Sequence, residues 1–218
     1  MSGAQSVGLQ TAHNTASDFS AHEFLIKMAI NKIWVSTLVQ VKAVTNAGGL
    51  SPVGYVDVQP MVNMLDGANN ATPHGTIYHI PYLRLQGGTN AIILDPVIND
   101  IGICVFAHSD ITSVKNTGAI SNPNSGRNNA PADGLYIGGV LNGVPQQYIM
   151  FAGGGISVIS PTKVTISAPN LELDGSSGIT IKGKITSDSD AVFAGISVDN
   201  HYHTDPQGGV TTPPIAGT

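Results

Sequence analysis

The sequence predicts an all-β protein built in two successive parts, and three observations carry that prediction. Stretches of β-branched residues, in which apolar and polar residues alternate, recur along most of the chain between clear turn signals. Only 11% of the 218 residues are charged and 26 are glycine, whereas about 25% of the residues of a typical globular domain are charged. Beyond residue 152 the apolar runs become short and repetitive, which marks the start of the second part.

Residues 1–33 form an expected N-terminal extension. Met1–Asp18 is polar and aperiodic, so we expect it to be irregular. Ser20 and Glu23 then match the capping box, in which Ser at the N-cap is followed three residues later by Glu. This pattern predicts a short helix that starts at Ser20 and ends near Ile30–Lys32. The N-terminus has neither the basic start nor the apolar core of a secretory signal, so we expect a soluble protein made in the cytoplasm.

Residues 34–152 predict a small closed barrel or sandwich, because several short strands follow one another within about a hundred residues. A turn is expected at Asn46–Gly49, and residues 116–134 are expected to be a long surface loop. The uncharged stretch from residue 134 to 162 is broken by Gly and Pro, so it does not predict a transmembrane helix. The expected strands are Trp34–Val44, Val53–Val58, Ile77–Pro81 with Tyr82–Leu85, Ala91–Leu94, Gly102–Ala107, Leu135–Val140 and Gln147–Phe151.

Residues 153–198 predict strands of only three to six residues, separated by Pro, Gly and Asn, including one in which Val192–Val198 alternates. No intervening segment is bulky enough to cover their apolar faces. One chain of this kind cannot bury enough surface to offset the entropy lost on ordering it. A repeat architecture or an intertwined oligomer would solve that problem, and three-fold symmetry would leave no sheet edge open.

His201-Tyr202-His203 opens the last segment, residues 199–218, and is the candidate metal site. Residues i and i+2 of a strand point to the same face, so both imidazoles leave the chain together. A turn or bulge at Asp199-Asn200 would bring them to the side of the preceding apolar residues. Three chains would then supply six imidazoles, which suits an octahedral ion such as iron better than zinc. The alternative is a pair of surface histidines that bind nothing.

Several other classes of function find little support. The net charge is −5 and no Lys/Arg cluster exists, so we expect no nucleic-acid partner. No nucleophile, phosphate-loop or zinc-protease motif is present, so we expect no enzyme. Asp95, Asp100 and Asp110 are expected to be turn carboxylates. Cys104, the single cysteine, lies in an apolar run and is expected to be buried and structural.

Two segments and the His pair resemble a known family. Tyr55–Pro60 is similar to an early barrel strand of that family, and Pro96–Phe106 resembles its Gly-Asp-x-Gly segment, with Asn99 where Gly is common. With His201-Tyr202-His203 before a Gly/Thr/Pro tail, the chain from about residue 34 onward resembles the central spike proteins of contractile-tailed bacteriophages. These are iron-tipped, membrane-piercing proteins of the tail baseplate.

The resemblance implies an OB-fold barrel over residues 34–152, an intertwined homotrimeric triple-stranded β-helix over 153–198 and a metal-bound apex over 199–218. It makes His201 and His203 ligands of one octahedral iron ion per trimer, with six His ligands from three chains. It further implies a structural protein of the virion, at the tail baseplate tip beneath hub and tube proteins, that pierces the bacterial outer membrane and has no small-molecule substrate.

Two alternatives remain open at this point. A trimeric host-binding fibre tip or adhesin would be expected to expose aromatic residues near its end, where only Tyr202 lies. A small metal-dependent enzyme would need a third ligand and an open position on the ion, and Asp205 is the only clear candidate nearby.

Overall fold

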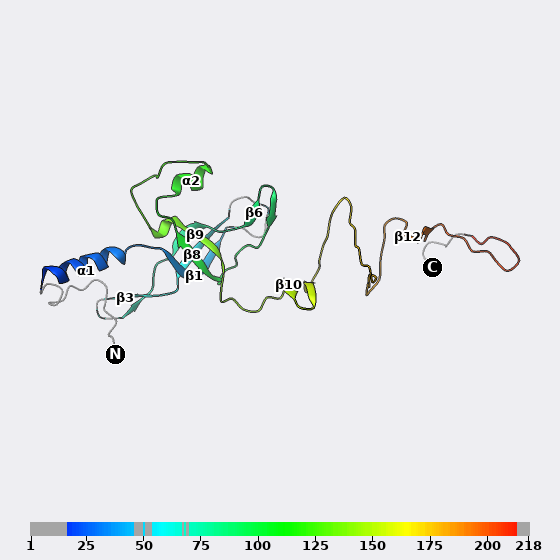
Figure 1. Ribbon diagram of the computed structural model, residues 1–218, viewed down its shortest axis with the longest axis horizontal. Helices are drawn as coiled ribbons and strands as arrows, with labels where there is room; N and C mark the ends of the chain where they lie inside the picture. The colour runs from blue at the N-terminus through cyan, green and yellow to red at the C-terminus, as the bar shows by residue number, and fades with distance from the viewer. Residues whose placement is uncertain (1–16, 46–49, 51–53, 67, 69, 213–218) are drawn as a thin grey trace. The chain divides into compact units, whose positions relative to one another are not determined.

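The computed structural model describes residues 17–45, 50, 54–66, 68 and 70–212 (Figure 1). Most of the N-terminal stretch expected to be irregular, the turn expected at 46–49 and residues 213–218 lie outside the described residues. The chain divides into two units, residues 1–148 and 149–218, and each is described by itself.

Helix α1 spans Asp18–Ile30, so the helix expected near the N-terminus is present and ends where predicted. The N-cap prediction was wrong, because Ser17 and not Ser20 caps the helix. The Ser17 hydroxyl accepts a hydrogen bond from the amide of Ser20, in the first turn, at 3.2 Å. An exposed ion pair between Lys27 and Glu23, one turn apart, adds local support.

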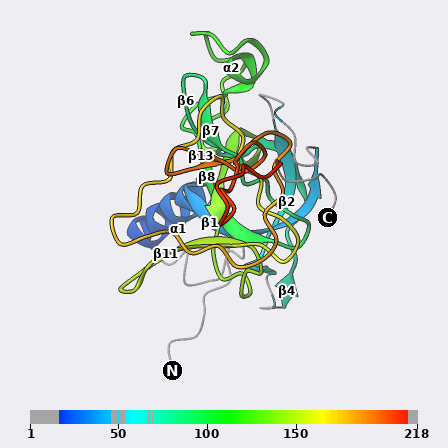
Figure 2. The same ribbon diagram turned by 90° about the vertical axis from the view of Figure 1, so that its right-hand side faces the viewer.

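Five strands form the main sheet, which is antiparallel and curled, and the all-β prediction is confirmed. Its strand order is β5-β2-β1-β8-β9, and β1, β2 and β8 can be followed in Figure 2. The two ends of the sheet approach each other. Tyr82, just after β5, forms a parallel bridge with Tyr136 of β9, and the Leu83 amide donates to the Tyr136 carbonyl at 2.7 Å. The strands are β1 Ser36–Val44, β2 Tyr55–Pro60, β5 Ile77–Pro81, β8 Ile101–Phe106 and β9 Gly134–Gly139.

The core lies inside this curled sheet, because alternate residues of its strands point inward. Two tyrosines, Tyr82 and Tyr136, close the core, and each ring lies against a glycine. A Cβ atom on Gly54 would lie 2.2 Å from the Tyr82 ring, and one on Gly102 would lie 2.3 Å from the Tyr136 ring. The buried apolar residues are Val39, Val41, Val56, Val58, Ile80, Tyr82, Cys104, Phe106 and Tyr136.

Asn99 lies in the turn before β8. Asn99 has a φ of +78°, a backbone conformation that favours glycine and that Asn tolerates better than most residues. The Asp100 carboxylate accepts a hydrogen bond from the Val97 amide at 2.8 Å, so the prediction of a turn carboxylate is confirmed there.

The first unit also contains two short helices and two short hairpins. Helix α2 spans Thr112–Thr117 and a 3-10 helix spans Pro131–Asp133, so the long loop expected over residues 116–134 is partly ordered. The remaining elements form two short hairpins. They are β3 Met64–Leu65 with β4 Ala71–Thr72, and β6 Leu85–Gly87 with β7 Asn90–Ile92.

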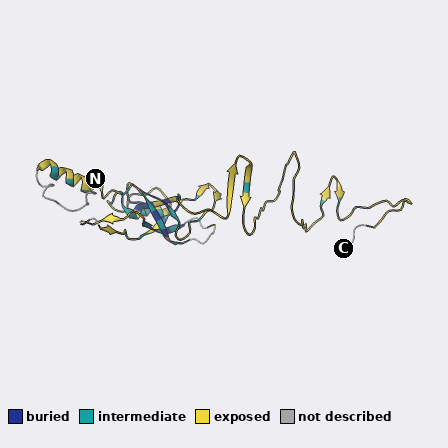
Figure 3. Ribbon diagram, turned by 90° about the horizontal axis from the view of Figure 1, so that it is seen from below, coloured by how far each residue is buried: buried dark blue, intermediate teal, exposed yellow. Residues whose placement is uncertain are grey.

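The second unit contains four short strands and no buried residue over residues 149–212. β10 Tyr148–Ala152, which begins at the last residue of the first unit, pairs with β11 Gly155–Ile159, and β12 Val192–Phe193 pairs with β13 Ile196–Ser197. Figure 3 shows exposed residues along these strands, whereas the buried residues lie in the main sheet. Across the described residues, no helix is long and apolar enough to cross a membrane.

Candidate metal centre

The segment before the histidines folds back on itself. The prediction that Val192–Val198 is one alternating strand was wrong, because Ala194 and Gly195 both have positive φ and turn the chain between β12 and β13. A second turn follows at residues 198–200, where a turn or bulge was expected. In it the Asn200 amide donates to the Ser197 hydroxyl oxygen at 2.8 Å.

Asp190 ties this turn to the hairpin. Its carboxylate accepts a hydrogen bond from the Asp199 amide at 3.1 Å. The Ser197 hydroxyl and the Asp199 amide hold the pKa of Asp190 below its usual value. The carboxylate is therefore charged near neutral pH and braces the chain directly before His201.

His201 is fixed through one of its two ring nitrogens. Its Nδ1 atom lies 2.9 Å from the Val198 carbonyl oxygen and 3.1 Å from that of Ser197. A carbonyl oxygen only accepts, so the hydrogen-bond network assigns the proton of the neutral ring to Nδ1 and leaves Nε2 as the nitrogen with a lone pair. Metal-binding histidines commonly donate their second N–H to a carbonyl in this way.

The two imidazoles are neighbours. The ring centres of His201 and His203 lie 5.0 Å apart, and the ring planes are 83° to one another. Two imidazoles bound at adjacent positions of an octahedral ion would have ring centres about 4.6 Å apart, given a metal–nitrogen distance of about 2.1 Å. The spacing and the free Nε2 of His201 both fit a shared ion.

One chain supplies only part of such a site. Within the described part of the chain, no group of three or more His, Cys, Asp or Glu side chains is placed to hold a metal ion. Asp205, the third ligand that a metal enzyme would need, has its Oδ1 atom engaged by the Gln207 amide at 2.9 Å and the Gly209 amide at 2.7 Å.

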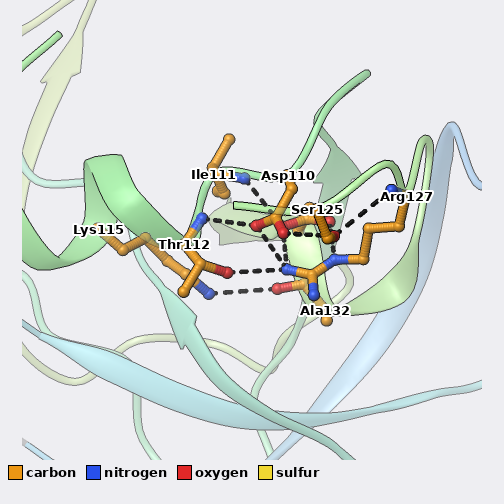
Figure 4. Close-up of polar contacts among 8 residues, drawn as sticks. Asp110, Ile111, Thr112, Lys115, Ser125, Arg127 and Ala132 are labelled. Atoms are coloured by element: carbon orange, nitrogen blue, oxygen red, sulfur yellow. Dashed lines mark hydrogen bonds and ion pairs between the residues drawn. The ribbon is translucent and has the colours of Figure 1, made fainter. Parts of the chain in front are cut away.

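A second cluster of charged residues lies in the first unit and was missed by sequence reasoning (Figure 4). The Arg127 guanidinium donates to Asp110 at 2.8 Å and to Asp133 at 2.7 Å, and both carboxylate side chains are fully buried. Ser125 donates to Asp110 at 2.6 Å, and the Ile111 amide donates to Asp133 at 3.1 Å. These contacts join the two ends of the loop between β8 and β9.

Electrostatics in this cluster favours the charged carboxylates. Hydrogen bonds from Ser125 and Thr112, assisted by Arg127, lower the pKa of Asp110 to about 2. The Arg127 guanidinium holds the pKa of Asp133 below its usual value against the opposing effect of burial. Because the charges and hydrogen-bonding groups of Asp110, Arg127 and Asp133 are paired with one another, we interpret the cluster as structural, stabilising the loop between β8 and β9. The only signal in the sequence was a single Arg within a polar stretch, 17 and 6 residues from its partners.

The turn-carboxylate prediction is confirmed for Asp110, whose carboxylate accepts a hydrogen bond from the Thr112 amide at 2.9 Å in addition to its ion pair with Arg127. It was wrong for Asp95, which lies in an ion pair. Asp95 pairs with Arg84 at 2.8 Å and accepts a hydrogen bond from the Tyr82 hydroxyl at 2.6 Å. The prediction for Cys104 is confirmed, since it is completely buried and burial raises the pKa of its thiol to about 11.

No protein-family model matches this chain, and a search of curated proteins finds no match.

Proposed function

We propose that the protein is a structural homotrimer, the central spike of a contractile bacteriophage tail. The observation that carries the proposal is the second unit, which has no buried residue over 149–212 but carries regularly spaced apolar pairs. The pairs begin at residues 156, 164, 171 and 179, which are 8, 7 and 8 residues apart. They are Ile156/Val158, Val164/Ile166, Leu171/Leu173 and Ile179/Ile181, and each of these residues is more than half exposed.

Association of three chains accounts for this pattern. In a strand, an i, i+2 pair presents both side chains on one face. In the single chain only Ile156/Val158 lies in a strand, β11, and the other three pairs lie outside any strand. We propose that these segments become strands on association, so that each pair forms one apolar step along the chain. Three chains wound together as a triple-stranded β-helix would bury these steps against one another and pair the exposed strand edges. A single chain gains too little burial to offset the entropy of ordering it.

The first unit is proposed to be an OB-fold barrel. Support comes from the five strands in the order β5-β2-β1-β8-β9 and from the bridge between Tyr82 and Tyr136 that joins the ends of the sheet. An OB-fold is a five-stranded, partly open barrel of this kind. It would attach the spike to hub and tube proteins of the baseplate, so that the protein resides in the virion.

The apex is proposed to hold one iron ion per trimer, with His201 and His203 of each chain as ligands. Six imidazoles suit an octahedral ion and leave no position for water or substrate, so the ion would be structural. It would lock three chain ends that otherwise fray. The protein would then act by stiffness, concentrating the force of tail contraction on a small area of the bacterial outer membrane, and not as an enzyme.

The metal proposal is tested by the double variant His201→Ala/His203→Ala. Elemental analysis of the purified protein should fall from about one iron per three chains to none, because the variant removes all six ligands. The matched control is His22→Ala/His108→Ala, which removes two exposed histidines of the first unit and should retain the iron. Undiminished iron in the His201/His203 variant would rule out this site.

A further inference from the structure

The chain reverses direction directly after the candidate ligands. Thr204 and Val210 form an antiparallel bridge. One residue further out, Thr211 is hydrogen-bonded to His203 in both directions. The His203 amide donates to the Thr211 hydroxyl oxygen at 3.0 Å, and the Thr211 amide donates to the His203 carbonyl at 2.8 Å. A single residue therefore satisfies both backbone polar groups of His203.

Asp205 builds the turn that brings Thr211 back to this position. Its carboxylate accepts from the amides of Gln207 and Gly209, and its own amide donates to the Gly209 carbonyl at 2.8 Å. Gly208 has a φ of +87°, and a Cβ atom on Gly209 would lie 2.8 Å from the Asp205 carboxylate. The Asp205 side chain and the two glycines together define the turn.

We propose that Thr211 is a positioning residue for the metal-binding imidazoles, held opposite His203 by the Asp205 turn. His201 is fixed by the carbonyls of Ser197 and Val198, and the Thr211 contacts fix the backbone that carries His203. The His201 ring and the backbone of His203 are thus held in place before an ion binds, and less ordering remains to be done when it does. This inference rests on the proposed metal site at His201 and His203.

The test compares Thr211→Val, which keeps the shape and removes the hydroxyl, with Thr211→Ser, which keeps the hydroxyl. Both are made in the full-length chain. Iron release into an excess of chelator is followed over time, and hydrogen exchange of the His203 amide is measured in metal-free protein. Thr211→Val should release iron at least about 10-fold faster, as expected when a group that orients a ligand is lost. It should also speed exchange of the His203 amide, while Thr211→Ser resembles the wild type in both measurements.

Different failures have different meanings. Wild-type protein that binds iron, with Thr211→Val unchanged in release and exchange, would overturn the positioning role and leave the metal site intact. If Thr211→Ser were as impaired as Thr211→Val, the hydroxyl would not be the group responsible, and the positioning role would fall as well. Wild-type protein without iron would refute the metal site and the positioning role together.

Discussion

A substitution at Ile181 tests whether association of several copies of the chain buries the apolar side chains that are exposed in the single chain. It is 62% exposed in the single chain and belongs to the last of the evenly spaced apolar pairs. At about 180 Å² for a whole isoleucine, association could bury about 110 Å² of it, which at about 25 cal/mol per Å² is worth about 2.8 kcal/mol per chain. Ile181→Ser should therefore weaken a trimer by up to about 8 kcal/mol, counting three chains.

The matched control is Ile120→Ser in the loop of the first unit, where Ile120 is fully exposed. It makes the same chemical change and should alter stability by less than about 0.5 kcal/mol. The assay is sedimentation equilibrium over a range of protein concentrations, together with thermal unfolding followed by circular dichroism. Ile181→Ser should dissociate at concentrations where the control and the wild type remain trimers. Equal trimer stability in the two variants would refute the proposal that Ile181 is buried between chains.

Two further predictions concern the first unit. Asp133→Asn should lower its free energy of unfolding by about 2 kcal/mol, because the charge-assisted hydrogen bonds to Arg127 are lost. The folded-state pKa values of Asp110 and Asp133 lie below the usual range, so the stability from this cluster is present above about pH 4 and is lost as the pH falls toward 2. Urea unfolding between pH 5 and pH 2.5 should show a smaller pH dependence in Asp133→Asn, and identical pH profiles would contradict this. Cys104, with a pKa raised to about 11 by burial, should react with a thiol reagent at pH 8 only as fast as the unit unfolds, so rapid labelling of native protein would count against its burial.

Sequence reasoning located the five strands of the main sheet, because one face of that sheet is buried, and it missed the short strands β3, β4 and β6. In β2 every second residue is buried, and the apolar residues Val56 and Val58 alternate with Asp57 and Gln59 as the pattern predicted. β8 is also buried at every second residue, but its sequence is apolar on both faces. Sequence reasoning missed the Asp110–Arg127–Asp133 cluster because those residues meet only after the loop between β8 and β9 has closed. The spacing of these three residues along the sequence does not predict that their side chains come into contact.

The two histidines of the candidate metal centre could be singled out from the sequence, whereas the local structure around them could not. The i, i+2 spacing of His201 and His203 and the turn at Asp199-Asn200 were visible in the sequence. Alternation predicted one strand over Val192–Val198, but positive φ at Ala194 and Gly195 folds that segment into a hairpin. The alternation of apolar and polar residues predicts which side chains share a face, but it does not predict where a two-residue turn reverses the chain.

The most direct test of the central claim measures mass and metal in the same purified sample. Light scattering should give the mass of three 22.5 kDa chains, and elemental analysis should find about one iron ion for those three chains. A monomer without bound metal would contradict both the proposed trimeric spike and its apex.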